Sequence, residues 1–200
     1  MIAIIDYDAG NMKSVEKAFQ YLNEDAVITR DRKAILEADR VVLPGVGAFG
    51  DAMERLHSYD LVETIQDAVK SGKPFFGICL GLQLLFDSSE ETPGVKGLGL
   101  LPGEILRIPA AEGLKIPHMG WNKLELRSPS PLLEGAEGEY VYFVHSFHAE
   151  PEDRSIITSV CDYGMEVTAS VGRGNVQAFQ FHPEKSSRVG MRLLKNFVEL

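Results

Sequence analysis

Cysteine, long apolar runs and excess positive charge are all scarce in this sequence. The only cysteines are Cys79 and Cys161, too few for a disulfide framework, and we expect both thiols to be reduced. Lysine and arginine number 20 against 29 aspartates and glutamates, a net charge of −9, and no basic cluster is present to bind a nucleic-acid backbone. No segment has the length and apolarity of a membrane span, and the N-terminus lacks the basic region and cleavage site of a signal peptide. We therefore expect a cytoplasmic protein with neither a nucleic-acid nor a membrane partner.

The sequence also lacks low-complexity segments, linkers and internal repeats. Its 200 residues, 44% of them hydrophobic, suffice for a full hydrophobic core. We expect residues 1–200 to form one domain.

Short apolar runs alternate with helical patterns in the first half of the chain. Strands are predicted at 2–5, 26–29, 40–43 and 75–78, and helices at 15–22, 34–38, 52–56 and directly after residue 79. The side chain of Asn11 is placed to cap the first helix. Strands that alternate with helices form a parallel sheet covered on both faces, with ligand sites at the carboxyl ends of the strands.

The second half consists of short extended segments joined by turns rich in glycine and proline. They lie at 104–108, 123–126, 140–147, 156–161, 166–171 and 175–181, and we expect them to add antiparallel strands to the sheet. A helix is predicted at 192–198, with Leu193, Leu194 and Phe197 inward. The predicted fold class is α/β, with a mostly parallel central sheet, helices on both faces and added antiparallel strands.

Cys79 stands at the corner between the strand at 75–78 and the following helix. Gly77 and Gly81 flank it two residues away on each side, as glycines flank the serine of a nucleophile elbow, where neighbouring side chains would obstruct the turn. The positive end of the helix dipole favours a cysteine thiolate, and the N–H of Leu80 would face an oxyanion. A small buried hydrophobe between two glycines is the alternative interpretation.

The loop at 44–50 contains three glycines and follows the third predicted strand, at the edge of the sheet where Cys79 lies. Glycines at 45 and 47 let the Val46 peptide sample two orientations, so the loop is a candidate second half of an oxyanion hole. A plain turn is the alternative. The spacing Gly45-x-Gly47-x-x-Gly50 also fits a dinucleotide motif, but that motif belongs near the first strand, with an acidic residue about 20 positions further on.

His182 and Glu184 project to one side of an extended segment, because they are two residues apart with Pro183 between them. Glu184 can then hold one ring nitrogen while the other faces a nucleophile, which gives the base and the orienting group of a catalytic triad. A solvated loop histidine beside a surface glutamate is the alternative. The elbow and this pair together favour the triad.

The other histidines carry weaker signals. His145 and His148 are three apart in an extended run, hence on opposite faces, and no second ligand pair supports a metal. His57 is expected on the surface at a helix end. His118 lies in an unusual loop with the only tryptophan, Trp121, which would suit a protein interface if exposed; a core role is the alternative.

Several separated motifs resemble one known family. Residues 77–83, Gly-Ile-Cys-Leu-Gly-Leu-Gln, look like the nucleophile motif of the class I (triad) glutamine amidotransferases, and residues 181–184, Phe-His-Pro-Glu, look like their His-x-Glu motif. Within that class, 44–50, 117–122 and 142–146 resemble the glutaminase subunits that serve histidine biosynthesis. The resemblance runs from Ile4 to the end of the sequence and implies the flavodoxin-like fold of this class.

The resemblance also implies an activity, site residues and a partner. The activity is hydrolysis of glutamine to glutamate and ammonia through a thioester on Cys79, with no cofactor and no metal. His182 and Glu184 would complete the triad. Val46, Gly47, Leu80 and Gln83 would contact glutamine, with the N–H groups of Val46 and Leu80 as the oxyanion hole. Asn11, Trp121, Tyr142 and Lys185 would face a separate (β/α)8-barrel cyclase subunit, which consumes the ammonia within a heterodimer.

Two other classes of function stay open from the sequence. A cysteine peptidase or related hydrolase would share the elbow and the histidine but would cleave peptides. A non-enzymatic binding subunit could keep the fold, but would have no reason to keep Cys79, His182 and Glu184 together. Within the resembling class, the subunits for anthranilate or aminodeoxychorismate are close competitors, and the stretch 117–122 disfavours them.

Overall fold

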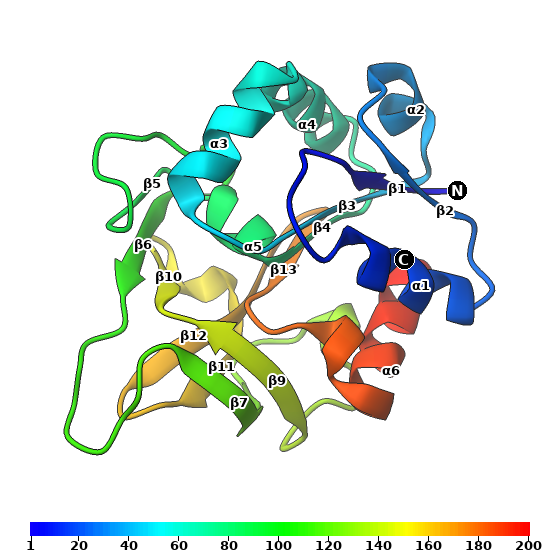
Figure 1. Ribbon diagram of the computed structural model, residues 1–200. Helices are drawn as coiled ribbons and strands as arrows, with labels where there is room; N and C mark the ends of the chain where they lie inside the picture. The colour runs from blue at the N-terminus through cyan, green and yellow to red at the C-terminus, as the bar shows by residue number, and fades with distance from the viewer.

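An eight-stranded sheet forms the centre of the computed structural model, which describes residues 1–200 (Figure 1). Its strand order is β2-β1-β3-β4-β13-β12-β11-β8. The bounds are Ile2–Ile5 for β1, Ala26–Thr29 for β2, Arg40–Gly45 for β3, Phe75–Cys79 for β4, Glu125–Leu126 for β8, Ile157–Asp162 for β11, Glu166–Arg173 for β12 and Val176–Phe179 for β13. The first five strands in this order pair in parallel and the other three are antiparallel. The mostly parallel sheet with antiparallel additions is confirmed.

Five further strands form two small sheets of their own. One has the order β10-β6-β5 and the other consists of β7 and β9. Their bounds are Ser88–Ser89 for β5, Gly103–Arg107 for β6, His118–Lys123 for β7, Tyr140–His145 for β9 and Phe147–Pro151 for β10. The prediction that all late extended segments join the central sheet is therefore wrong. Their pairing partners lie far apart in the sequence, and an extended pattern does not reveal which edge a strand will join.

Helices cover both faces of the central sheet, as predicted (Figure 1). The bounds are Met12–Tyr21 for α1, Arg32–Glu37 for α2, Phe49–Ser58 for α3, Leu61–Lys70 for α4, Leu80–Leu84 for α5 and Ser187–Val198 for α6, with 3₁₀ turns at Pro131–Leu133, Arg154–Ile156 and Pro183–Lys185. Helices α2 to α5 pack on one face, and α1 and α6 on the other. None of these helices is long and apolar enough to cross a membrane.

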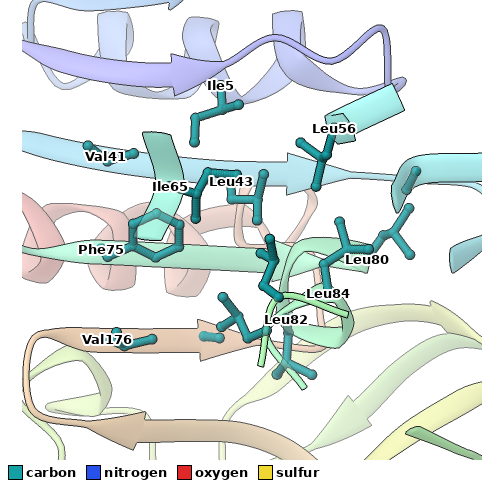
Figure 2. Packing of buried hydrophobic residues seen from close by; sticks show 14 of the residues in the cluster. Ile5, Val41, Leu43, Leu56, Ile65, Phe75, Leu80, Leu82, Leu84 and Val176 are labelled. Atoms are coloured by element: carbon teal, nitrogen blue, oxygen red, sulfur yellow. The ribbon is translucent and has the colours of Figure 1, made fainter. Parts of the chain in front are cut away.

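Alternate residues of the central strands enter two separate cores. In β1, Ala3 and Ile5 belong to the core under α2 to α5, whereas Ile2 and Ile4 belong to the core under α1 and α6. Figure 2 shows strand residues such as Ile5 packing in the first of these cores. Each fully buried aliphatic or aromatic side chain contributes roughly 1.5–3 kcal/mol. Packing from both sides therefore fixes β4 and the position of Cys79 at its carboxyl end.

Candidate active site

Cys79 has the strained backbone of a nucleophile elbow. Its φ is 54° and its ψ is −107°, a conformation that costs a non-glycine residue about 1–3 kcal/mol and persists only where the surroundings enforce it. A Cβ on Gly81 would lie 1.8 Å from the carbonyl oxygen of Leu43, and a Cβ on Gly77 would lie 3.0 Å from the backbone of Gly81. The elbow geometry, including the need for a glycine on each side, is confirmed.

A pocket of about 320 Å³ opens beside the sulfur of Cys79. It is lined by Val46, Gly47, Cys79, Leu80, Gln83, Glu91, Pro117, Val144, His145, Ser146 and Phe147. The four residues predicted to contact glutamine are all among them. Glu91, the only carboxylate of the lining, was missed, because nothing in its local sequence distinguishes it from a surface acid. Its Oε2 accepts a hydrogen bond from the N–H of Phe49 at 2.7 Å, which ties it to the start of α3.

His182 and Glu184 form a buried pair behind the pocket. The Nδ1 of His182 lies 2.7 Å from Oε1 of Glu184, and both side chains are fully buried, which rules out a solvated surface pair. The Nε2 of His182 is buried without a hydrogen-bond partner. Burial lowers the pKa of His182, but interactions with Cys79 and with the Glu184 carboxylate outweigh burial and raise that pKa to about 9. His182 therefore carries a proton at neutral pH.

Strand β9 holds the backbone of His182 in place. The N–H of His182 donates to the carbonyl of Tyr142 at 3.0 Å. The hydroxyl of Ser186 accepts from the N–H of Tyr142 at 3.0 Å and donates to the carbonyl of His182 at 2.6 Å. These three bonds fix the direction of the imidazole from both sides of its Cα.

A second pair of buried histidines, His118 and His145, adjoins the pocket through His145. The amide of Asn122 contacts Nε2 of His118 at 3.3 Å, Nδ1 of His118 lies 3.0 Å from Nε2 of His145, and Nδ1 of His145 lies 2.8 Å from the carbonyl of Phe147. Two neutral rings, each donating from Nδ1, satisfy all three contacts. Burial lowers the pKa of His118 to about 4 and that of His145 to about 3, so both rings are neutral at pH 7.

The predicted loop position of His118 is wrong. His118 belongs to β7, is buried, and stacks on Phe143 and Tyr163 with centroid distances of 4.7 and 3.9 Å. The structure contains no group of three or more His, Cys, Asp and Glu side chains that could hold a metal ion. His57 is exposed in the last turn of α3, as predicted.

Two glutamines connect this second histidine pair to the sulfur. The amide of Gln83 donates to the carbonyl of Phe147 at 3.2 Å and to Oε1 of Gln180 at 3.1 Å. The amide of Gln180 in turn donates to the sulfur of Cys79 at 3.8 Å. Gln180 is fully buried and was not singled out from the sequence, since its alignment with the sulfur depends on how β13 pairs with β4.

Gly45 and Gly47 of the 44–50 loop are present for different reasons. A Cβ on Gly45 would lie 1.9 Å from the hydroxyl of Tyr7, which donates to the carbonyl of Pro44 at 2.7 Å. Gly45 is therefore required by packing, and its predicted role in letting the Val46 peptide change orientation stays a prediction. Gly47 has a φ of +116° and no atom within 4 Å of an added Cβ, so here glycine is required by the backbone conformation.

Asn11 precedes α1, but its side chain makes no capping hydrogen bond. Its Nδ2 donates instead to Oε1 of Glu184 at 2.6 Å, so the predicted cap is wrong because the buried carboxylate competes for the amide. Among the other residues expected to face a partner, Trp121 is 52% exposed and Lys185 is exposed, whereas Tyr142 is half-buried with its ring edge against Trp121. Trp121 therefore has no core role.

Both cysteines are free, and Cys161 is buried.

The chain is similar to one protein family over nearly its whole length. The family Glutamine amidotransferase class-I matches residues 3–200 of the chain. The fold agrees: a crystal structure of a glutamine amidotransferase covers the whole chain with a TM-score of 0.78 at 20% identity, spanning 98% of that protein. The glutaminase domain of CTPS from Trypanosoma brucei, solved with acivicin, covers 99% of this chain and 93% of its own with a TM-score of 0.68 at 17% identity. The chain belongs to the class-I glutamine amidotransferases.

More similar relatives share a single name. A protein of Methanothermobacter thermautotrophicus is 52% identical over 200 residues, which cover all of this chain and 98% of the relative. One from Syntrophotalea carbinolica is 50% identical over 206 positions, covering both chains fully, and one from Aquifex aeolicus is 50% identical over 97% of this chain and 94% of its own. Each of these relatives is named imidazole glycerol phosphate synthase subunit HisH.

Proposed function

We propose that this chain is the glutaminase subunit of an imidazole glycerol phosphate synthase, an enzyme of histidine biosynthesis. The observation that carries the proposal is that Cys79, on its strained elbow, lines a small pocket and interacts with His182, which is paired with the buried Glu184. Full-length similarity to subunits of that name supports the choice among amidotransferases.

The pocket suits a free amino acid that carries a side-chain amide. Its volume of about 320 Å³ lies at the small end of ligand sites. The carboxylate of Glu91 complements the α-ammonium group of glutamine, while the amide of Gln83 and the backbone near Gly47 offer polar contacts. The substrate amide carbon would then lie at Cys79.

The chemistry follows from the groups around the sulfur. The Cys79 thiolate attacks the amide carbon of glutamine, and the N–H groups of Leu80 and Val46 receive the oxyanion. His182, protonated and held by Glu184, gives its proton to the departing ammonia. A water activated by the same histidine then hydrolyses the thioester and releases glutamate.

The partner is a cyclase subunit with a (β/α)8-barrel fold. It uses the ammonia and phosphoribulosyl-formimino-AICAR phosphate to form imidazole glycerol phosphate and AICAR, within a cytoplasmic heterodimer. The exposed side chains of Met119 and Trp121, 61% and 52% accessible on β7, together with Lys185, suit a protein interface.

The decisive measurement is glutamate release by the purified chain alone, with a purified cyclase subunit, and with cyclase plus its acceptor. We expect slow release by the isolated chain and an acceleration on the order of 10²–10³ in the loaded complex. This is the typical effect of one oxyanion-hole donor on the rate. Absence of glutamate release in all three mixtures, or cleavage of peptides instead, would contradict the proposal.

The acceleration resides in the peptide between Gly45 and Val46, because that peptide carries the Val46 N–H. Tyr7 holds the carbonyl of Pro44 and fills the space beside Gly45, whereas the space beside Gly47, on the other side of Val46, is open. Gly47→Ala, strained at a φ of +116°, should therefore alter the stimulation by the cyclase more than it alters the affinity for the cyclase. Gly174→Ala, at another open left-handed glycine far from the pocket, is the matched control, and equal effects of the two variants would refute this role.

A further inference from the structure

Asn11 reaches the buried pair from a segment that does not line the pocket. Its Nδ2 donates to Oε1 of Glu184 at 2.6 Å, and the same oxygen lies 2.7 Å from Nδ1 of His182. The other carboxylate oxygen, Oε2, is buried without a hydrogen-bond partner. Because two donors meet on a single oxygen, the amide of Asn11 fixes where that oxygen lies relative to the imidazole ring.

The backbone of Asn11 is arranged for this contact rather than for α1. Its φ of 79° is left-handed, and α1 begins without a side-chain cap, although asparagine is among the residues that cap helices best. Asparagine also tolerates the left-handed region better than most residues do. Both properties leave the amide free to turn inward toward Glu184.

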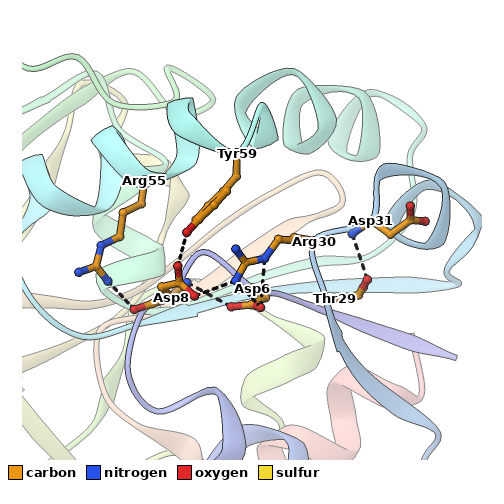
Figure 3. Close-up of polar contacts among 7 residues, drawn as sticks. All are labelled: Asp6, Asp8, Thr29, Arg30, Asp31, Arg55 and Tyr59. Carbon is orange, nitrogen blue, oxygen red and sulfur yellow. Dashed lines mark hydrogen bonds and ion pairs between the residues drawn. The ribbon is translucent and has the colours of Figure 1, made fainter.

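The loop that carries Asn11 is held in place at its other end. The side chain of Arg30 donates to Asp6 and to Asp8 at 2.7 Å each, and Arg55 and Tyr59 bind Asp8 as well (Figure 3). Asp8 itself has a left-handed φ of 58°. The segment from Asp6 to Asn11 is thus fixed to α3 and to the end of β2 before it reaches the carboxylate.

From these contacts we infer that Asn11 is a positioning residue for the glutaminase reaction, one that holds Glu184 in the plane of the His182 ring. The inference rests on the proposed function, because that function supplies the reaction. The contact between Asn11 and Glu184 lies wholly within this chain. Asn11 does not line the pocket, so its effect must pass through Glu184 and through the His182 ring, whose Nδ1 lies 3.4 Å from the Asn11 amide. The only ion pair of Glu184 is the one with His182.

The kinetic test compares three variants in the loaded complex with the cyclase. Asn11→Ala removes the donor, and Asn11→Asp keeps the shape but donates only when protonated. Asn23→Asp makes the same change at the exposed left-handed asparagine just beyond the other end of α1. We expect kcat to fall about 10-fold or more for both Asn11 variants, with KM for glutamine unchanged, since supporting hydrogen bonds typically contribute 10- to 100-fold. Asn23→Asp should match the wild type.

A second test needs neither partner nor turnover. The rate at which iodoacetamide alkylates Cys79 is followed against pH in the isolated chain; the fully buried Cys161 does not compete. For Asn11→Asp, the rate relative to wild type should fall as pH rises, because deprotonation removes the donor and places a second negative charge beside Glu184. For Asn11→Ala the relative rate should be lowered evenly across pH.

The outcomes separate the inference from the proposed function. A relative alkylation rate that is unchanged, or that rises with pH in Asn11→Asp, overturns the positioning role, since an added negative charge would then simply favour the imidazolium. Equal losses in Asn11→Asp and Asn23→Asp also overturn it, by showing a general effect of charge. If wild-type chain and cyclase release no glutamate, the proposed function fails, while the alkylation profiles still decide the role of Asn11.

Discussion

Two buried histidine sites near Cys79 are treated by the protein in opposite ways. In the first, His182 is paired with a buried carboxylate, and its pKa is raised to about 9 in spite of burial. In the second, His118 and His145 bond to each other, and burial lowers their pKa values to about 4 and about 3. Burial alone therefore does not decide the charge of a histidine here; the hydrogen-bond partner does.

The two sites accordingly suit two kinds of work. A protonated imidazole held by Glu184 can give a proton to a leaving group. Two neutral imidazoles in a fixed chain of donors cannot, but they hold the carbonyl of Phe147 and thereby the wall of the pocket. The His182 site can transfer a proton, whereas the His118–His145 site stabilises the pocket wall.

Cys79→Ser is expected to have the largest effect. A serine hydroxyl is far less ionised than a thiol, so glutamate release should fall to the background of the assay while the fold survives the small change in volume. Because Cys79 contributes to the raised pKa of His182, the variant should also lower that pKa, which NMR of the imidazole can follow. The pKa values of His118 and His145 should not move. Retained glutamate release would refute the triad.

Glu184→Gln tests whether the carboxylate makes the difference between the two sites. The amide can still touch His182 but does not stabilise the imidazolium, so kcat should fall by about 10²- to 10⁴-fold with KM for glutamine little changed. The measurement is steady-state glutamate release by the loaded complex. Glu199→Gln, which removes an exposed carboxylate directly after α6, is the control. Unchanged turnover in Glu184→Gln would mean that the pair has no catalytic role.

The neutral site predicts a loss of stability in acid. Between pH 6.5 and about 4, the unfolded chain binds a proton at His118 that the folded chain does not, so the free energy of unfolding falls as pH falls. At 1.36 kcal/mol per pKa unit, His118 alone contributes about 3 kcal/mol to this loss. His182, with its raised pKa, is protonated in both states below pH 6.5 and contributes nothing there. Urea unfolding across this range measures the slope.

His118→Phe should have the smallest effect on turnover. The ring stacking with Phe143 and Tyr163 can persist, but Nε2 of His145 loses its donor, which should cost about 1–3 kcal/mol of unfolding free energy at pH 7. Glutamate release should change by less than about 10-fold, one tenth of the smallest loss expected for Glu184→Gln. The acid-induced loss of stability should also become shallower in this variant. An undiminished slope would show that other groups cause it.

The predictable part of the molecule is the part encoded by local patterns. The short apolar strands, the glycines around Cys79 and the His-Pro-Glu segment each carry their signal within a few residues. Even α4 was readable, since Leu61, Ile65 and Ala68 follow the helical period and are buried, although no helix was predicted there. Local patterns were thus sufficient to predict the candidate nucleophile and its two candidate partners.

Contacts between distant segments could not be predicted in the same way. The bond from Asn11 to Glu184, and that from His118 to His145, depend on which strands become neighbours. The packing role of Gly45 was missed for the same reason, because the hydroxyl that fills its side-chain space belongs to Tyr7.

Tyr7 and Gly45 limit the order in which this chain can change over evolutionary time. Alanine at position 45 would overlap the Tyr7 hydroxyl at 1.9 Å, whereas Tyr7→Phe removes that oxygen together with its bond to Pro44. A lineage can therefore lose the hydroxyl first and acquire a side chain at position 45 afterwards, but the reverse order passes through a clash. The second substitution therefore blocks reversal of the first. Once a side chain occupies position 45, tyrosine can return at position 7 only after glycine has returned at position 45.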